Sequence, residues 1–209
     1  MTISLVIGNG ESRLKFNWQE IKYNNIIGCN AIHRDLVVDH LVCCDRRMAT
    51  EACENKKNSN TSIYVRSRNY HYFRKIRKNK NIRELPEIPY HGEFKRDQPD
   101  HWGSGPYAVL IAANSDDQKI ILVGFDLYSK DGKINNVYKG TNNYNEINSQ
   151  SIDHSYWVHQ IAQVFRFYPD KKFIVLNQNG WIMPKEWFLD NVTFKNFEEY
   201  FVDNKYLCN

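Results

Sequence analysis

The residues that could do chemistry in this sequence gather where short apolar runs end. The first run, residues 3–7, leads into Gly8-Asn9-Gly10-Glu11-Ser12. Glycine can adopt positive φ and lets the backbone approach a ligand closely. A serine that caps the following helix leaves N–H groups that attract anions. We therefore predict a tight turn that holds a nucleotide phosphate or ribose. An ordinary strand, turn and helix is the alternative interpretation.

Polar residues also follow the later apolar runs. In a doubly wound parallel sheet, ligands bind outside the carboxyl ends of the strands. The following residues are therefore expected to meet around one site: Asn30, Asp45, Asp126 with Tyr128, and Asn177 to Asn179. A NAD-binding fold usually has an acidic residue where Asn30 stands, and Arg13 occupies the place of the third glycine of the dinucleotide fingerprint. Both departures argue against a dehydrogenase.

The elements that must position these residues alternate along the chain. Apolar and β-branched runs predict strands, whereas apolar residues at helical spacing predict helices. Strands are expected at residues 3–7, 25–29, 39–45, 61–65, 119–125 and 172–176, and helices at residues 46–54, 105–113 and 155–168. Strands separated by helices indicate an α/β protein with a single Rossmann-like, doubly wound, mainly parallel sheet.

One such domain is expected to span residues 1–180. Within it, residues 66–102 are predicted to form a basic and aromatic insertion, or lid, that ends in a proline-containing stretch. Residues 181–209 form an aromatic-rich tail, in which Phe194, Phe197, Tyr200 and Phe201 recur at helical intervals. Packing on the domain is the expected role of this tail. The alternative is a contact between subunits of a homo-oligomer.

Composition sets the outer limits. A chain of 209 residues suits one well-cored domain. Its net charge of +4 permits a nucleic-acid partner without requiring one. The five cysteines are odd in number and lack C-x-x-C spacing, which is typical of reduced thiols in a cytoplasmic protein. We see no signal peptide and no apolar run of membrane-spanning length, so a cytoplasmic protein without a transmembrane segment is expected.

Several of these segments together resemble the bacterial sialyltransferases of glycosyltransferase family forty-two. The similarity follows the order and approximate spacing of that family from residue 3 to about residue 180, in Gly8-Asn9-Gly10-Glu11-Ser12, Cys29-Asn30, Ser104-Gly105, Ile121-Leu122-Val123-Gly124-Phe125-Asp126-Leu127-Tyr128 and His154-Ser155. The family transfers a sugar from a CMP-linked donor with inversion and without a metal ion. The resemblance therefore implies a nucleotide-sugar donor, with neither a metal nor another cofactor.

The resemblance also implies roles for single residues. The nucleotide pocket would be formed by Gly8, Asn9, Gly10, Ser12, Asn30, Ser104, Gly105 and Asp126. Tyr128 and Tyr138 would donate hydroxyl hydrogens to the leaving phosphate. His154 would take the proton of the acceptor hydroxyl, with His159 as the fallback. Glycosyl transfer needs such a base and such charge stabilisation, and histidine titrates near neutral pH. A helix-start cluster at His154 and packing roles for the tyrosines are the alternatives.

Two positions depart from the family pattern. His101 stands where the family has an arginine three residues before its Ser-Gly, and Asp45 stands where it has an asparagine beside the sugar. A carboxylate would repel the carboxylate of sialic acid, but it can accept hydrogen bonds from sugar hydroxyls. We therefore expect a neutral sugar on CMP or UDP, and we count Asp45 among the catalytic candidates.

The stretch from residue 64 to residue 80 interleaves basic and aromatic residues. This composition suits phosphate contacts combined with base stacking, so the acceptor is expected to be a glycan or a nucleic acid. The candidate acceptor-binding residues are Arg66, Arg68, Arg74, His101 and Trp102. A solvated helix face with aromatic anchors in the core explains the same pattern.

The function predicted from these patterns is a metal-independent, inverting glycosyltransferase that uses a pyrimidine-nucleotide sugar and a histidine base. One alternative is a glycosyltransferase that modifies a base of DNA. Another is a non-catalytic module that binds a nucleotide in the same pocket. The catalytic and non-catalytic classes differ in whether the predicted base faces the phosphate site.

Overall fold

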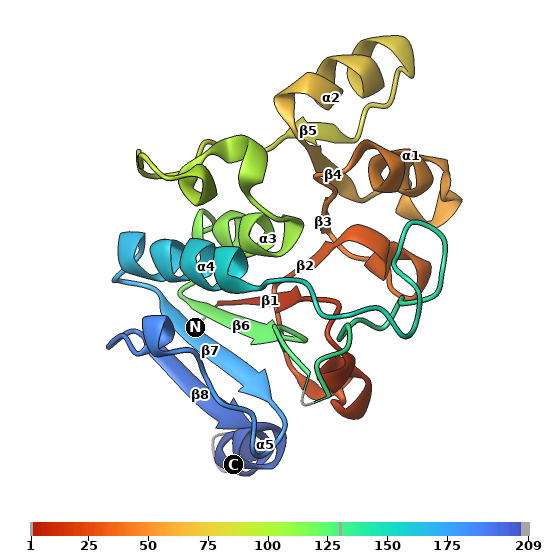
Figure 1. Ribbon diagram of the computed structural model, residues 1–209. Coiled ribbons are helices and arrows are strands. Elements are labelled where there is room, and N and C mark those ends of the chain that lie inside the picture. Colours follow the sequence, from red (N-terminus) through yellow and green to blue (C-terminus); the bar gives the residue numbers. More distant parts are fainter. Residues whose placement is uncertain (1, 130, 206–209) are drawn as a thin grey trace.

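The computed structural model describes residues 2–129 and 131–205 and contains one sheet of eight strands (Figure 1). All neighbouring strands run parallel, in the order β5-β4-β3-β2-β1-β6-β7-β8. The strands are β1 (Ile3–Ile7), β2 (Asn25–Cys29), β3 (His40–Val42), β4 (Ser62–Val65), β5 (Ile82–Glu84), β6 (Lys119–Val123), β7 (Lys172–Asn177) and β8 (Val192–Asn196). The predicted α/β class and Rossmann-like sheet are confirmed.

The connections between the strands hold helices of very different length. The α-helices are α1 (Arg46–Glu54), α2 (Ser67–His71), α3 (Ser104–Ala113), α4 (Ser155–Phe167) and α5 (Phe197–Lys205). A π-helical turn, Tyr72–Ile76, continues α2, and short 3-10 helices are formed by Glu11–Lys15, Trp18–Glu20, Asn30–Arg34, Lys56–Asn58, Lys95–Asp97, Pro99–His101 and Lys185–Trp187. The predicted bounds hold for α1, whereas α3 begins one residue earlier than predicted, at Ser104.

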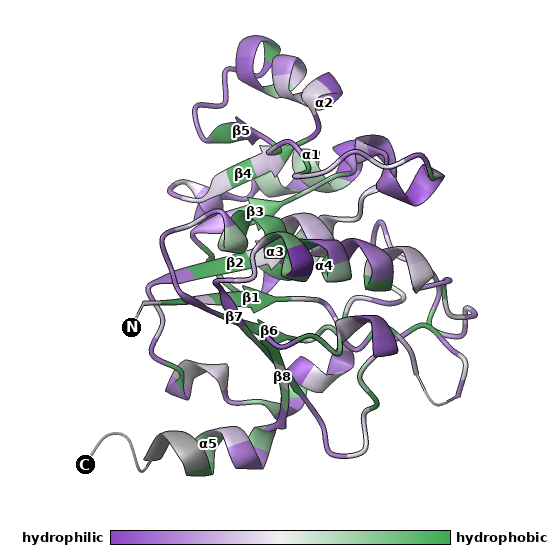
Figure 2. Ribbon diagram, turned by 90° about the vertical axis from the view of Figure 1, so that its left-hand side faces the viewer, coloured by the Kyte–Doolittle hydropathy of each residue, from purple (hydrophilic) through white to green (hydrophobic). Residues whose placement is uncertain are grey.

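The two faces of the sheet bury separate halves of the core. Side chains alternate along a strand, so Val6 of β1 faces the layer of α3 and α4, whereas Leu5 and Ile7 face the layer of α1 and α5. Parallel strands that are buried on both faces are apolar throughout. Figure 2 shows this as largely green strands between purple surface segments. This apolar composition explains why the central strands could be predicted from the sequence.

The predicted set of strands lacks the two at the edges of the sheet. β5 lies inside the expected lid and pairs with β4, and β8 lies in the expected tail and pairs with β7. The strand predicted at residues 172–176 is therefore not the last one. An edge strand is covered on fewer sides and is often short and polar, as Ile82-Arg83-Glu84 illustrates. Lid and tail thus each contribute a strand to the same sheet; residues 206–209, including Cys208, lie outside the described part.

The strand order reverses at β1, which lies between β2 and β6. At this switch point the ends of β1 and β6 approach closely, because Gly8 N donates to Val123 O (2.8 Å) and Gly10 N donates to Gly124 O (2.8 Å). A Cβ on Gly8 would lie 2.4 Å from Gly124 O. Gly8 and Gly10 do not have positive φ; the left-handed glycine here is Gly124, with φ +72°. The expected reason for the first two glycines is therefore corrected: they allow two chain segments to touch.

No helix in the described ranges, 2–129 and 131–205, is both long enough and apolar enough to cross a membrane.

Candidate functional site

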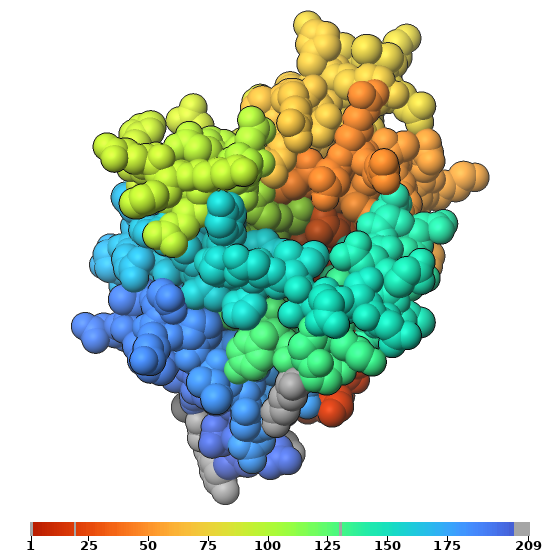
Figure 3. Space-filling view, in the orientation of Figure 1, coloured from red at the N-terminus to blue at the C-terminus, as the bar shows by residue number. Residues whose placement is uncertain are grey.

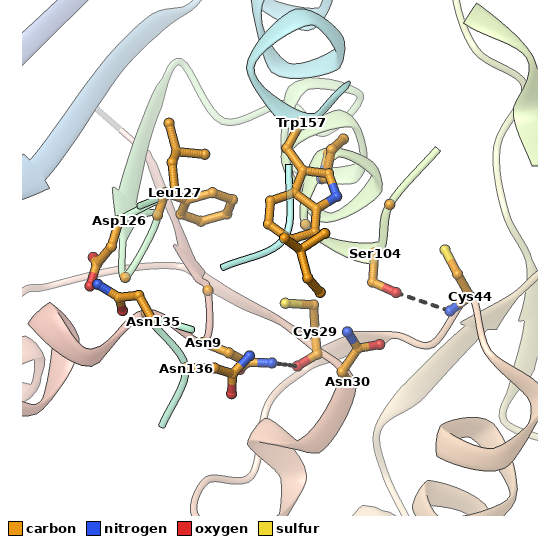
Figure 4. A pocket seen from close by; sticks show the side chains of 18 of the residues that line it. Asn9, Cys29, Asn30, Cys44, Ser104, Asp126, Leu127, Asn135, Asn136 and Trp157 are labelled. Carbon is orange, nitrogen blue, oxygen red and sulfur yellow. Dashed lines mark hydrogen bonds between the residues drawn. The ribbon is translucent and has the colours of Figure 1, made fainter. Parts of the chain in front are cut away.

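A cavity of about 390 Å³ opens at the carboxyl ends of the central strands (Figure 4). Its wall is built from the residues that directly follow β1, β2, β3, β4 and β6, from the start of α3, from the loop between β6 and α4, and from α4 itself. This is the position at which open α/β sheets bind ligands. Of the predicted nucleotide residues, the cavity is lined by Gly8, Asn9, Gly10, Asn30, Ser104, Gly105 and Asp126.

Two asparagines present unpaired amide oxygens in this wall. Asn9 Nδ2 donates to Cys29 O (3.2 Å) and to Tyr144 Oη (3.2 Å), whereas its buried Oδ1 has no partner among the described residues. The buried Oδ1 of Asn30 has no partner there either. Asn30 begins its 3-10 helix with φ +51°, a conformation that asparagine tolerates better than most residues. A buried acceptor without a partner is costly, so a ligand group or water is expected to donate to each oxygen.

The amino end of α3 forms the opposite wall. The first N–H groups of a helix have no partner within the helix, and they attract anions. Ser104 Oγ accepts a hydrogen bond from Cys44 N (3.1 Å), so its own proton is available to a ligand. Gly105 and Pro106 also line the cavity. A phosphate group is the ligand that this wall suits best.

The turn after β1 is held by Asp126 and not by a serine cap. Ser12 donates from both N (2.8 Å) and Oγ to the carboxylate of Asp126, and Asn177 Nδ2 donates to the same carboxylate (3.3 Å). Ser12 is buried, lies within the 3-10 helix that Gly10 caps, and does not line the cavity. Burial raises the pKa of Asp126, and the hydrogen bonds from Ser12 oppose this effect. The predicted capping role of Ser12 is wrong. Its hydroxyl donates a hydrogen bond to Asp126 instead.

Tyr138 lies away from the cavity in a buried polar cluster. Its Oη accepts from Arg13 Nη2 (2.7 Å) and donates to Asp35 Oδ2 (2.6 Å). Burial and the bond to Asp35 raise its pKa. The tyrosine of this loop that reaches the cavity is Tyr144, whose Oη bonds to Asn9. The structure therefore gives Tyr138 a structural contact and places Tyr144 where a phenol can meet a ligand.

Tyr128 and His154 lie together outside the cavity wall. Their ring centroids are 5.8 Å apart, and Tyr128 stacks on Trp181 at 6.3 Å. Tyr128 Oη donates to Ile182 O (2.9 Å) and so fastens the segment that leads to β8. His154 is the residue before α4, as the alternative interpretation expected, although Trp157 on the same helix points into the cavity.

The predicted fallback base, His159, faces a different partner. Its Nε2 lies 2.6 Å from Asp97 Oδ1, and Tyr90 Oη donates to the same oxygen (2.9 Å). His159 is absent from the cavity wall. This cluster fastens the segment before α3 to α4.

Asp45 and Arg66 place a carboxylate and a guanidinium on the cavity wall. Asp45 precedes α1 without capping it, and within the described residues its carboxylate makes no hydrogen bond or ion pair. Arg66 Nη2 donates to Trp102 O (2.8 Å), and Nη1 donates to Pro99 O and lies 3.8 Å from Asp100. The side chain of Arg66 is 12% exposed.

The other predicted acceptor residues are dispersed. Trp102 lines the cavity and is fully buried. The exposed His101 accepts from Gln160 Nε2 through its carbonyl (3.0 Å) and is not part of the wall. Arg68 is 66% exposed, and Arg74 donates to the carbonyls of its own loop, at residues 79 and 80. Only Arg66 and Trp102 of this group therefore meet the cavity.

Sequence reasoning missed part of the wall, mainly in the loop between β6 and α4. Missed lining residues include Asn135, Asn136, Asn143, Tyr144, Asn145 and Trp157. The signal was the density of asparagine, since Asn135-Asn136 and Asn142-Asn143 flank Tyr138. Val137 N donates to Asn9 O (2.8 Å), which joins this loop to the turn after β1. Amides can donate and accept at once, so the wall suits hydroxyl-rich or heterocyclic ligands.

The two cysteines that line the cavity, Cys29 and Cys44, are not activated as nucleophiles. Burial raises the pKa of Cys29 to about 12 and that of Cys44 to about 11. Both are free thiols, as predicted. A neutral thiol is a poor nucleophile, so covalent catalysis by cysteine is not what this wall offers. Across the described chain, no group of three His, Cys, Asp or Glu side chains is arranged to hold a metal ion.

Comparison of the chain with protein-family models found no match, and neither the curated proteins nor the solved structures gave a significant match.

Proposed function

We propose that the protein binds a pyrimidine-nucleotide sugar, linked to CMP or UDP, in this cavity and transfers the sugar to an acceptor hydroxyl with inversion and without a metal ion. One observation supports the proposal above all others. Asn9, Asn30 and the Ser104-Gly105 pair come from distant parts of the chain and line one cavity, and the buried amide oxygens of both asparagines have no partner among the described residues. The resemblance to family forty-two predicts this set of residues as the donor site.

The proposed binding mode follows the chemistry of the wall. The phosphate lies at the amino end of α3, where the helix dipole and the hydroxyl of Ser104 stabilise negative charge. Arg66 adds a positive charge on the same side. The amides of Asn9 and Asn30 accept from the base or the ribose. As the anomeric carbon–oxygen bond breaks, the same donors hold the departing phosphate.

The acceptor oxygen attacks the anomeric carbon from the face opposite the nucleotide, and the nucleotide leaves with the bonding electrons. The acceptor proton passes to a base. Asp45 supports this role, because it lines the cavity and its carboxylate has no hydrogen-bond or ion-pair partner among the described residues. The sequence-based candidate, His154, stands outside the wall, next to a helix that contributes Trp157. We therefore propose Asp45 as the base. His154 is the alternative base, and the experiment below distinguishes the two.

Ligand binding is tested first, by thermal shift with CMP, CDP, UMP, UDP, GDP, ADP and NAD. A ligand that binds only the folded state raises the melting temperature. We expect selective shifts with the pyrimidine nucleotides. Equal shifts with all nucleotides, or none, would remove the donor assignment.

Donor hydrolysis by single variants then separates the two candidate bases, since removal of the group that accepts the proton slows the reaction most. Asp45→Asn is expected to lower the rate by about 100-fold or more, and His154→Gln by less than about threefold. The reverse pattern would restore His154 as the base.

A non-catalytic nucleotide-binding module is the second candidate. The observation in its favour is that three of the four predicted catalytic residues, Tyr128, Tyr138 and His154, do not line the cavity. Nucleotide binding without any hydrolysis of CMP-linked or UDP-linked sugars would support this candidate over the transferase.

A further inference from the structure

The charges of this molecule are strongly separated. Residues 46–84 contain twelve Lys and Arg residues against three acidic residues, Glu51, Glu54 and Glu84, which gives this segment a formal charge of +9. The whole chain carries +4, so the remainder carries −5. The segment includes α1, α2 and β5, at one edge of the sheet. We call its exposed part the basic surface.

Much of this charge is solvent-facing and uncompensated. Lys75, Lys78 and Lys80 are exposed, and within the described chain no carboxylate lies within ion-pair distance of any of them. Arg77 does pair with Glu54, at 2.8 Å. Figure 1 shows α2 and the turn after it projecting beyond the sheet edge, and the same protrusion is largely purple in Figure 2. A protruding, unneutralised cationic surface attracts polyanions.

The aromatic residues of this segment are used inside the protein. Phe73 is fully buried and belongs to the core beneath α1. The ring of Tyr72 is half-buried and carries the guanidinium of Arg46 at 4.0 Å from its centroid. These rings therefore anchor the basic surface to the fold and do not form a stacking platform. Recognition by the basic surface has to come from its charges.

The basic surface continues into the cavity at two points. Asp45 lines the cavity, and the next two residues, Arg46 and Arg47, are exposed at the start of α1. Arg66 also lines the cavity and directly precedes α2. In Figure 3 a recess opens below the yellow surface of α2, beside the orange surface of α1 and above the teal surface of the loop before α4. The basic surface therefore borders this recess and reaches the cavity wall through Arg66.

We propose that the basic surface binds the phosphate backbone of a nucleic acid. A nucleic acid offers closely spaced negative charges that several lysines and arginines can contact at once, without reading the base sequence. An anionic membrane is less well matched, because the apolar side of α2 and its π-helical continuation packs inward through Phe73 and cannot insert. Exposed Ile76 is the large aliphatic side chain that remains there, at 65% exposure.

Fluorescence anisotropy with labelled single-stranded and double-stranded oligonucleotides tests the proposal on the full chain. The test variant is Lys75→Glu/Lys78→Glu/Lys80→Glu. The control is Lys22→Glu/Lys172→Glu/Lys185→Glu, which changes the net charge equally at exposed lysines outside the segment. At about 50 mM salt we expect the test variant to bind at least about tenfold more weakly than the wild type, and the control to stay within about threefold.

Salt dependence supplies a second readout. Neutralised phosphates release counterions, so log K falls linearly with log salt concentration. The test variant is expected to show a shallower slope than the wild type, whereas the control keeps the wild-type slope. Equal losses in both variants, or no binding of either oligonucleotide by the wild type, would overturn the proposal. Tighter binding to phosphatidylglycerol vesicles than to oligonucleotides would overturn it in favour of a membrane.

The same proteins separate this proposal from the proposed function. The lysine variant keeps every residue that lines the cavity, so its thermal shift with pyrimidine nucleotides is expected to equal that of the wild type. If the wild type binds oligonucleotides through the basic surface but shows no thermal shift with nucleotides, the nucleic-acid proposal is supported and the proposed donor site is contradicted. A variant that loses both has lost its fold, which circular dichroism detects.

Discussion

Asn30 shows at the scale of one residue how conformation and recognition are combined. Its φ of +51° is the left-handed region, where asparagine and glycine are the best tolerated residues. Its amide oxygen is buried and has no partner within residues 2–129 and 131–205, and Asn30 lines the cavity. A residue chosen only for its backbone would be glycine. The asparagine therefore indicates a use for the amide.

Asn30→Gly removes the amide and keeps the backbone conformation accessible. We expect nucleotide binding to weaken by about tenfold, the value of about one lost hydrogen bond, and the ligand-free melting temperature to change little. Thermal shift against CMP and UMP measures both quantities. Lys78→Gly is the matched control, since Lys78 also has a positive φ (52°) and does not line the cavity. An unchanged nucleotide shift in Asn30→Gly would show that the amide makes no contact.

The sequence alone does not predict which partner each tyrosine of the loop between β6 and α4 contacts. Tyr138 and Tyr144 lie six positions apart on one loop, and nothing in their spacing tells which hydroxyl meets Arg13 and Asp35 and which meets Asn9. The turn after β1 was predictable because its glycines and its asparagine follow an apolar run directly. The loop residues depend on long-range contacts, such as Val137 N to Asn9 O, that have no local signature.

At the scale of elements, Glu51 connects α1 with two segments that each contribute a residue to the cavity wall, the 3-10 helix Asn30–Arg34 and the loop of Asn143. Its carboxylate accepts from Arg34 Nε (2.5 Å) and Nη2 (2.8 Å), at the end of the 3-10 helix that Asn30 begins. It also accepts from Asn143 Nδ2 (3.0 Å), in the loop that lines the cavity. The hydrogen bonds from Arg34 lower the pKa of Glu51. The fold is therefore stabilised by the charged form of this group.

Glu51→Gln is expected to lower the free energy of unfolding by about 1 kcal/mol at neutral pH, because a charged acceptor of two guanidinium bonds is lost. A carboxylate with a lowered pKa in the folded state contributes stability above its unfolded pKa, and this contribution is lost as the pH falls through the folded pKa. The difference between wild type and Glu51→Gln should thus be complete well above the ordinary glutamate pKa of about 4.3 and should shrink as the pH falls below it, through the lowered pKa of the folded state. Urea unfolding at several pH values measures it.

The control for this prediction lies on the same helix. Glu54 is 59% exposed and pairs with Arg77, and exposed pairs contribute little. Glu54→Gln should therefore change the free energy of unfolding by less than about 0.5 kcal/mol. Equal effects of the two substitutions, or a Glu51→Gln effect that does not depend on pH, would contradict the assigned role of Glu51.

The elements themselves were predictable in proportion to their burial. β2 and α1 have the predicted bounds, since β2 is a buried apolar run and α1 shows helical spacing of Met48, Ala49 and Ala52. β5 and β8 escaped prediction because they are edge strands with mixed, partly exposed side chains. Their place is determined by pairing with β4 and β7, which a local pattern does not contain.

At the scale of the whole molecule, the tail completes the core. Trp187 is fully buried; its Nε1 donates to Val158 O of α4 (2.9 Å), and its ring meets Phe165 at 5.6 Å. β8 then pairs with β7 along the register Phe173↔Val192 to Asn177↔Asn196. A sheet that ends at β7 would expose this edge and the apolar side of α4. The expected boundary at residue 180 therefore falls between two neighbouring strands of one sheet, β7 and β8.

Truncation after residue 180 should abolish the cooperative unfolding transition, because it removes β8 and uncovers the side of the core that Trp187 fills. Trp187→Ala, a milder change, should lower the free energy of unfolding by about 3–5 kcal/mol through the cavity it creates. Phe188→Ala is the matched control: Phe188 is the next residue and is 64% exposed, so a change within about 0.5 kcal/mol is expected. Urea unfolding followed by far-ultraviolet circular dichroism measures all three chains. If residues 1–180 unfold with the same midpoint as the full chain, β8 is an appended strand, and the tail has no part in holding α4 and the cavity wall that Trp157 provides.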